Sequence, residues 1–272
     1  MRVQHLVAIS VAAAAVLVVQ PAASAAPPLP ASIAAIGDSI TRATDVCCWY
    51  GDHPAQSWST GGGLFDGIRS HYERILPLKP SILGHNYNGA VSGAKMRDAQ
   101  AQAQAAVAQQ AGYVTVLMGA NDLCTGSVST MTSPDTFRTD FSAAMDTLAA
   151  GLPADSHVFV SSIPNVYVLY QLFKDNATAR FVWSLAGICQ SLLSPFNTEA
   201  DRQAVVEREQ QLNAILSDVC ARYPFCLFDG NATFNYPFTS SDVSKLDYFH
   251  PSLGGQAKLA QLTWQHSWWS TT

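Results

Sequence analysis

The stretch "AAIGDSITRA" (34–43) decides the fold, because an apolar run stops there at a glycine, an acid and a hydroxyl. The run, "ASIAAIG" (31–37), has the short, continuous apolar character of a buried parallel strand. Gly37, Asp38 and Ser39 are therefore predicted at the carboxyl end of that strand. We expect a helix to begin there and to point backbone N–H groups at a bound anion. The simpler interpretation is that Asp38 or Ser39 only caps that helix.

Strand and helix patterns alternate along the rest of the chain. Apolar or β-branched runs predict strands, and Ser133 followed by Pro134 marks a helix start. The predicted strands are 31–37, 80–88, 113–119, 156–163 and 225–229, and the predicted helices are 94–110, 133–152, 198–223 and a last one after residue 250. This order implies right-handed crossovers and a mainly parallel five-stranded sheet, covered on both faces, in one α/β domain over residues 26–272. In such sheets ligands bind beyond the carboxyl ends of the strands.

The composition limits the partners. Hydrophobic residues make up 48% of the 272 positions, which is enough for one substantial core. The formal net charge is -5, and the 15 Lys and Arg residues are scattered along the chain. Because no basic stripe could track a phosphate backbone, nucleic acid is excluded as a partner.

The first 25 residues have the pattern of a secretory signal peptide. One positive charge precedes the apolar run 6–19, and "PAASAAP" (21–27) supplies the small residues that a signal peptidase reads, with cleavage after Ala25 or Ala26. The run is well short of the roughly 20 residues that span a bilayer, which argues against a membrane anchor. We expect a secreted protein.

The cysteines fit export. There are six, an even number that an oxidising compartment would pair. Cys220 and Cys226 are close in sequence and form the expected disulfide. The remaining four stay unassigned: Cys47, Cys48, Cys124 and Cys189. No Cys and His spacing matches a metal knuckle, so we expect no metal site.

Near the other end of the chain, Asp247 and His250 stand three residues apart in "SKLDYFHPSLGG" (244–255), ahead of the last helix. A serine hydroxyl needs a base to take its proton, and a histidine held by a carboxylate is such a base. The alternative is an ordinary surface histidine. The other histidines lack a comparable acid partner and are interpreted as structural: His53, His71, His85, His157 and His266.

Two further stretches follow predicted strands at the same edge of the sheet. "NGAVSGAKM" (88–96) offers the backbone N–H of Gly93, and "MGANDLC" (118–124) offers the side-chain amide of Asn121. With the N–H of Ser39, these donors would form an oxyanion hole for a tetrahedral intermediate. Taken singly, Gly93 is a turn residue and Asn121 a helix cap.

Together these stretches resemble the four blocks of the SGNH or GDSL hydrolase family. "GDSI", "NGAVSG", "GAND" and "DYFHP" fall in the family's order over residues 37–251. The resemblance implies a flavodoxin-like three-layer α/β/α fold and a serine esterase. It implies Ser39 as the nucleophile, Asp247 and His250 as the rest of a triad, and Gly93 and Asn121 as oxyanion donors beside the Ser39 N–H. Such a mechanism needs no metal or organic cofactor.

Shorter matches resemble the phospholipase B-type branch of that family. They are "SWSTGG" (57–62), "GANDLC" (119–124) and "FHPS" (249–252). One departure is Ala120, where many members carry a second glycine, and the backbone there should tolerate it.

Other classes fit less well. An ordinary α/β-hydrolase has a Gly-x-Ser-x-Gly elbow after several strands, whereas Thr41 replaces the second glycine here and the motif follows the first strand. A chymotrypsin-like protease is β-rich and has its histidine before its serine. A secreted binding module of the same fold is a further alternative, although a pure binder has no need for the five site residues.

The substrate is the least determined feature. The apolar, aromatic segment 165–196 predicts either a lid or acyl-chain groove, or a helix packed on the sheet. Trp264, Trp268 and Trp269 either touch lipid or sugar or are buried. With the branch resemblance, these features favour esters of lipids or (lyso)phospholipids, with transient contact to a lipid surface, over acetylated carbohydrates. We expect a monomer, and Asn176 and Asn231 each begin a glycosylation sequon.

Overall fold

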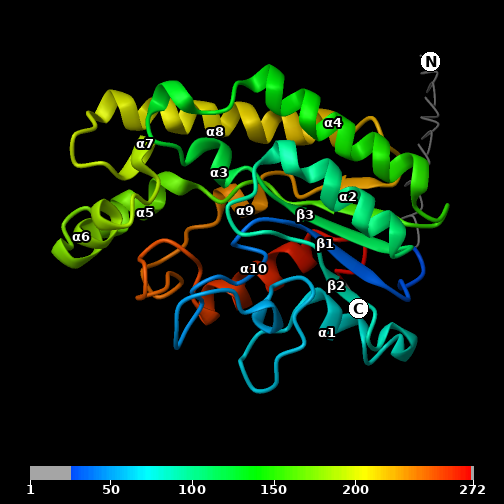
Figure 1. Cartoon of the computed structure of the whole chain (residues 1–272). Helices are drawn as coiled ribbons and strands as arrows, with labels where there is room; N and C mark the ends of the chain where they lie inside the picture. Colours follow the sequence, from blue (N-terminus) through cyan, green and yellow to red (C-terminus); the bar gives the residue numbers. More distant parts are fainter. Residues whose placement is uncertain (1–25, 271–272) are drawn as a thin grey trace, which may run out of the picture.

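The computed structural model describes residues 26–270, so the predicted signal peptide (1–25) lies outside the described residues. At the centre is a five-stranded sheet of order β2-β1-β3-β4-β5, in which all neighbouring strands are parallel. Its strands are β1 (Ile33–Gly37), β2 (Asn86–Asn88), β3 (Tyr113–Leu117), β4 (His157–Val160) and β5 (Cys226–Phe228). Helices cover both faces (Figure 1), which confirms the predicted α/β/α architecture.

The central strands are mostly apolar because each of their faces packs on a separate core. Ile33, Tyr113 and Phe159 belong to one buried cluster. Their immediate neighbours, such as Val114 and Val158, belong to the other. This alternation buries both sides of the sheet, which explains the continuous apolar runs in the sequence.

The long helices divide between the two faces. One face carries α2 (Ala99–Ala108), α4 (Pro134–Gly151) and α8 (Glu199–Cys220), and the other carries α1 (His71–Ile75) and α10 (Leu253–Gln265), as Figure 1 shows. The predicted start of α4 is confirmed, since the Ser133 hydroxyl accepts the N–H of Thr136. Short helices fill the connections: η1 (Pro54–Gln56), η2 (Pro80–Ile82), η3 (Met96–Asp98), α3 (Ala120–Leu123), η4 (Val128–Thr130) and α9 (Ala232–Asn235).

Two local predictions are wrong. Residues 39–45 form consecutive turns instead of a helix, because Ala43 and Asp45 adopt positive φ angles of 52° and 53°. The helix N-terminus that the sequence predicts at Ser39 is therefore not formed. Within 80–88 only the last three residues form a strand, because Pro80 starts a 3-10 turn instead.

The apolar segment 165–196 folds into α5 (Val166–Phe173), α6 (Ala177–Leu185) and α7 (Gln190–Leu193). Figure 1 shows α5 and α6 projecting beyond the sheet at the left. Within the segment Trp183 is buried, whereas Phe181 and Leu185 are 64% and 74% exposed, so part of it packs on the protein and part faces outward.

The three tryptophans near the C-terminus, Trp264, Trp268 and Trp269, pack into the protein instead of forming an exposed patch. Trp264 and Trp269 are buried against the cluster around Tyr113, and Trp268 is partly buried beside them. They therefore stabilise the α10 face of the sheet and do not form a surface for lipid or sugar.

The structure joins Cys220 to Cys226, the pair that the sequence favours, and also Cys124 to Cys189. Cys47 and Cys48 are not cross-linked, although their Sγ atoms lie only 2.6 Å apart. The pairing of all six cysteines is thus not seen.

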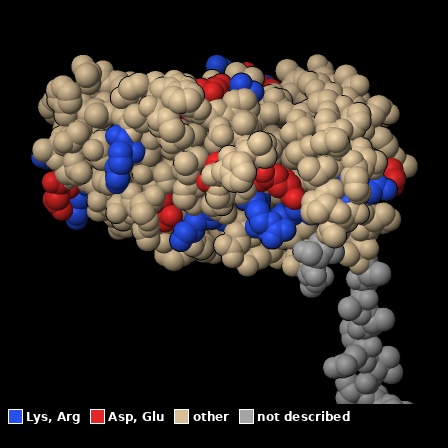
Figure 2. Space-filling view, turned by 90° about the horizontal axis from the view of Figure 1, so that it is seen from below, with Lys and Arg blue, Asp and Glu red and all other residues tan. Residues whose placement is uncertain are grey.

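The charge on one face and the length of the helices bear on possible partners. On the face seen in Figure 2, Lys and Arg are few and interspersed with Asp and Glu, without a basic stripe. No helix within residues 26–270 has the length and apolar character needed to cross a bilayer.

We expect the two disulfides to contribute unequally to stability. Cys124–Cys189 joins residues 65 apart and Cys220–Cys226 joins residues 6 apart. Chain entropy then predicts that replacing the first pair by serine costs about 4 kcal/mol of unfolding free energy, against about 2 kcal/mol for the second. Urea unfolding of the two double variants measures the difference, and equal losses would contradict this account.

Candidate active site

A buried glutamine holds the Ser39 turn from behind. Gln102 on α2 accepts the N–H of Gly37 at 2.8 Å and donates to the carbonyl oxygen of Gly37 at 3.0 Å. A Cβ at Gly37 would lie 2.5 Å from Thr41 Oγ1 and 2.9 Å from the Leu117 carbonyl oxygen, so only glycine lets the chain close this tightly. Ser39 stands two residues after Gly37 and is buried just beyond the carboxyl end of β1.

Asp38 lies beneath the same turn. Its Oδ1 accepts the N–H of Ile40 at 2.9 Å, and its Oδ2 is buried without a hydrogen-bond partner among the described residues. Burial raises the pKa of Asp38 to about 7, against the opposing effects of the Ile40 N–H and of nearby His250. When ionised, Asp38 is therefore a negative charge close to the proposed base.

The three predicted oxyanion donors have N–H groups to spare. Within residues 26–270, no acceptor takes the backbone N–H of Ser39 or of Gly93. Asn121 Nδ2 donates one hydrogen to the Ala94 carbonyl oxygen at 3.1 Å and has a second one available. Gly93 is exposed with a φ of 83°, a conformation that favours glycine.

Two carboxylates fix the spacing of these turns. Asp122, the residue after Asn121, accepts the N–H of Met96 at 2.9 Å through Oδ2, which ties the Asn121 helix to the segment that follows Gly93. Asp52 accepts from the hydroxyl of Ser92, the residue before Gly93, at 2.6 Å.

Asp52 also reaches the Ser39 turn. It accepts from Arg42 Nε at 3.0 Å and from Thr44 Oγ1 at 2.6 Å. Although partial burial opposes ionisation, these donors and the Ser92 hydroxyl hold the pKa of Asp52 below its ordinary value. The Ser39 and Gly93 turns are therefore braced against each other.

Asp247 and His250 form a tight pair in the 244–250 loop. His250 Nδ1 lies 2.5 Å from Asp247 Oδ2, and Asp247 Oδ1 accepts the backbone N–H groups of Phe249 and His250 at 2.9 and 3.1 Å. The loop is closed at its base, where Ser244 N–H donates to the His250 carbonyl oxygen at 2.8 Å. The carboxylate therefore fixes both the position and the tautomer of the imidazole.

The charges of this pair support each other. Burial opposes ionisation of both groups, but the hydrogen bond and the charge of His250 hold the pKa of Asp247 below its ordinary value. In the same way Asp247, Asp45 and Asp38 raise the pKa of His250 above its ordinary 6.5, although burial lowers it. His250 is thus a stronger base than a free imidazole.

Gln256 brings this C-terminal segment to the N-terminal turn. From the start of α10, its Nε2 donates to the Ile40 carbonyl oxygen at 2.7 Å, and its Oε1 accepts the N–H of Trp58 at 2.9 Å. The residue after Ser39 is therefore bonded directly to the helix that follows His250.

No hydrogen bond joins Ser39 to His250 in the described residues. The only hydrogen bond of the His250 ring is the one to Asp247, so both Nε2 and the Ser39 hydroxyl lack a partner there. Ile40, next to Ser39, and Ala120, next to Asn121, line the same hollow as His250. Nucleophile and base contacts in ligand-free enzymes often tighten only when substrate binds.

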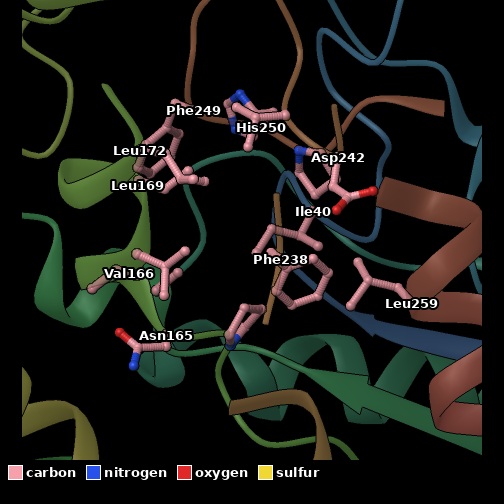
Figure 3. Close-up of a pocket in the computed structure, with 15 residues that line it drawn as sticks. Ile40, Asn165, Val166, Leu169, Leu172, Phe238, Asp242, Phe249, His250 and Leu259 are labelled. Carbon is pink, nitrogen blue, oxygen red and sulfur yellow. The ribbon is translucent and has the colours of Figure 1, made fainter. Parts of the chain in front are cut away.

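This hollow is apolar and has an empty volume of about 610 Å³, part of it open to solvent. In Figure 3, Val166, Leu169 and Leu172 of α5 face Phe238 and Ile40 across it, and His250 lies at one end. The arrangement offers a hydrocarbon-like cavity beside the proposed base.

One set of ligand atoms comes close enough to be considered for a metal. A carboxylate oxygen of Asp45, one of Asp247 and a ring nitrogen of His250 lie within 4.8 Å of one another. Both Asp247 oxygens, however, already accept hydrogen bonds, and one of them faces the imidazole at 2.5 Å. The set therefore does not fit a cation.

Among the histidines that were interpreted as structural, His71 shows such a role most clearly. Its ring nitrogens lie 2.9 Å from the Tyr113 hydroxyl and 2.8 Å from Thr263 Oγ1. Burial lowers its pKa to about 3, so His71 is neutral and links α1 to the sheet and to α10.

Sequence reasoning missed the supporting residues Gln102, Gln256, Asp45 and Asp52. The glutamines stand in helical stretches, where a lone amide gives no sign that it faces inward. Asp45 and Asp52 lie in "TDVCCWYGD" (44–52), which has no regular pattern. The one signal that could have indicated Asp45 and Asp52 is their position in an irregular segment shortly after "GDSI" (37–40).

Comparison with known proteins defines the class. Residues 33–263 match the family model described as GDSL-like Lipase/Acylhydrolase, so the chain belongs to this family of carboxylic ester hydrolases. No sequence among the curated proteins matches the chain.

Solved structures share the fold. LAE5, an alpha/beta hydrolase enzyme from the metagenome of Lake Arreo, Spain, is 18% identical with a TM-score of 0.54, over 86% of this chain and 94% of that one. The acetyl xylan esterase AlAXEase is 14% identical with a TM-score of 0.53, over 86% and 98%. A variant of Axe2, an acetyl xylan esterase from Geobacillus stearothermophilus, is 15% identical with a TM-score of 0.50, over 86% and 93%. At these identities the likeness concerns the fold alone.

We expect Gln256→Met to weaken both the fold and the site. The substitution keeps the side chain's length but leaves the Ile40 carbonyl and the Trp58 N–H unpaired, at a cost of about 2 to 5 kcal/mol. Displacement of α10 relative to Ser39 should also lower esterase turnover about 100-fold. Gln261→Met, at an exposed position of the same helix, is the matched control. Unchanged stability and turnover in the Gln256 variant would contradict the role given to this amide.

Proposed function

We propose that the protein is a secreted serine esterase that hydrolyses carboxylic esters of lipids or (lyso)phospholipids through a Ser39, His250 and Asp247 triad. The observation that carries the proposal is the 2.5 Å pair of Asp247 and His250 at the end of an apolar hollow, which also adjoins the turns of Ser39 and Asn121. The two disulfides are consistent with export.

The first step is acylation of the serine. His250 takes the Ser39 proton at Nε2 as the hydroxyl oxygen attacks the ester carbonyl carbon, and Asp247 stabilises the imidazolium that forms. The proton then passes from His250 to the leaving alcohol, which leaves an acyl-enzyme on Ser39.

Hydrolysis repeats the sequence with water. His250 deprotonates the water, which attacks the acyl carbonyl, and the proton returns to Ser39 as the acid leaves. In both tetrahedral intermediates the negative oxygen lies among the N–H groups of Ser39, Gly93 and Asn121. Among residues 26–270 the N–H groups of Ser39 and Gly93 have no acceptor, and Asn121 Nδ2 keeps a second hydrogen besides the one that it donates to the Ala94 carbonyl oxygen, so all three can donate.

The hollow favours a hydrocarbon acyl chain over an acetyl group. Its walls are mostly aliphatic and aromatic side chains, including Leu169, Leu172 and Phe249. Burying a chain of methylenes there contributes roughly 0.8 kcal/mol for each CH₂, whereas an acetyl group would leave most of the volume unused.

We expect Ser39→Ala to abolish turnover of a short-chain nitrophenyl ester, by about 10⁴-fold or more, and to stop labelling by a fluorophosphonate probe. Asn121→Ala should retain the fold and lower turnover about 100- to 1,000-fold through loss of one oxyanion donor. Ser129→Ala, at an exposed serine, controls for the loss of a hydroxyl. Labelling that persists in Ser39→Ala, or full turnover in Asn121→Ala, would remove that residue from the site.

We expect Leu169→Trp to shorten the preferred acyl chain. The larger side chain should fill the hollow, so kcat/KM for long-chain esters falls about 10-fold or more while short-chain esters change little. Leu185→Trp, where the leucine is 74% exposed, is the control. The measurement is a series of short-chain, long-chain and phospholipid esters, and activity confined to acetylated carbohydrate would overturn the lipid assignment.

A further inference from the structure

We propose that Asp45 is a positioning residue for the reaction, a second carboxylate that supports the Asp247–His250 pair from outside the triad and strengthens His250 as a base. The inference rests on the proposed function. Its basis is the approach of one Asp45 oxygen to within 4.8 Å of both an Asp247 oxygen and a His250 ring nitrogen.

Asp45 is held in this place by its own backbone and side chain. Its N–H donates to the Gly51 carbonyl oxygen at 2.8 Å, and its Oδ1 accepts the Gly51 N–H at 2.6 Å. Its φ of 53° lies in the left-handed region, where Asp and Asn are the most tolerated residues after glycine. The carboxylate is therefore fixed by the 44–53 loop.

The 44–53 loop is also bonded to the 244–250 loop. The Ser244 hydroxyl donates to the Asp45 carbonyl oxygen at 2.5 Å, and the Tyr50 hydroxyl donates to the Leu246 carbonyl oxygen at 3.1 Å. These contacts join residues almost 200 positions apart in the sequence. Because they do not involve the Asp45 carboxylate, they hold its distance from His250 when that group is changed.

The charged groups around His250 are unevenly distributed. On its own loop it faces Asp247, on the N-terminal side it faces Asp45 and Asp38, and all three carboxylates raise its pKa. Besides His250, the hollow has one charged side chain, Asp242, which accepts the N–H and the hydroxyl of Thr239. Lys245, the one cation in the 244–250 sequence, lies over the rings of Phe173 and Tyr248.

Asp45 and Asp247 also differ in their readiness to take up a proton. Burial and the neighbouring Asp247 charge raise the pKa of Asp45, whereas His250 holds the pKa of Asp247 low. As the pH falls, Asp45 is therefore neutralised first and the triad carboxylate stays ionised. At the pH where the enzyme works, both charges stabilise the imidazolium of the transition state.

The sign of the effect follows from the role of His250. The imidazole must be neutral to accept the Ser39 proton, so kcat/KM rises with pH through the pKa of His250. Removing the Asp45 charge lowers that pKa and moves the rise to lower pH. It also weakens the base, so kcat on the plateau falls, while KM stays unchanged because Asp45 does not line the hollow.

The test is Asp45→Asn in the full-length protein, since asparagine keeps the shape, the Gly51 hydrogen bond and the left-handed backbone. We expect the acid limb of kcat/KM to move down by about half a pH unit or more, with kcat lowered about threefold to tenfold. The His250 pKa, measured by NMR with its signal assigned through His250→Gln, should fall by the same amount. Asp175→Asn, at an exposed aspartate between α5 and α6, is the matched control.

The outcomes separate this inference from the proposed function. An unchanged His250 pKa in Asp45→Asn would overturn the role of Asp45 even in an enzyme that depends on Ser39. Full activity in Ser39→Ala would overturn the triad, while the NMR titration would still report on Asp45. Where Asp45→Asn does not fold, Asp45→Gly fits the same φ and removes the carboxylate. Loss of wild-type activity on adding a chelator would show instead that the carboxylates hold a cation, and would also overturn the inference.

Discussion

The side-chain amide of Gln256 is the contact on which the proposed site depends. It bonds to Ile40 and Trp58, about 200 residues earlier in the chain, and all of these groups are shielded from water. A buried amide that kept only one of its partners would lower the free energy of unfolding. The two hydrogen bonds therefore favour a single packing position of α10. Because His250 lies just before α10, the packing position of this helix also determines where the imidazole lies relative to Ser39.

A second principle is visible along the carboxyl edge of the sheet. Gln102, Asp38 and Asp122 are buried polar residues, and each accepts a backbone N–H group at or beside a turn. Turns without regular secondary structure need such partners because their backbone groups would otherwise be unpaired. In the part of the chain that the structure describes, the N–H groups of Ser39 and Gly93 have no such partner, as the oxyanion hole that we propose requires.

The 244–250 loop stands between two different environments. On one side it is bonded to the polar 44–53 loop through Ser244 and Leu246. On the other side Trp183 of α6 donates to the Tyr248 carbonyl oxygen at 3.1 Å, and Phe173 of α5 packs on the Tyr248 ring. The loop that carries the proposed base is thus also bonded to α6 and packed against α5, the helix that walls the hollow.

The sequence by itself determined the parallel α/β sheet, the order of its elements along the chain and the Cys220–Cys226 pair. It also singled out the residues that we propose for the site, Ser39, Gly93, Asn121, Asp247 and His250. Apolar runs have a local period, and the motifs are short, so both are visible without knowing what packs on what. Only the tertiary structure decided the turns at 39–45, the wall that α5 makes, and the partners Gln102, Gln256 and Asp45. These depend on contacts between residues 65 to about 200 positions apart, and a lone glutamine or aspartate has the same local signature whether it faces solvent or a buried neighbour.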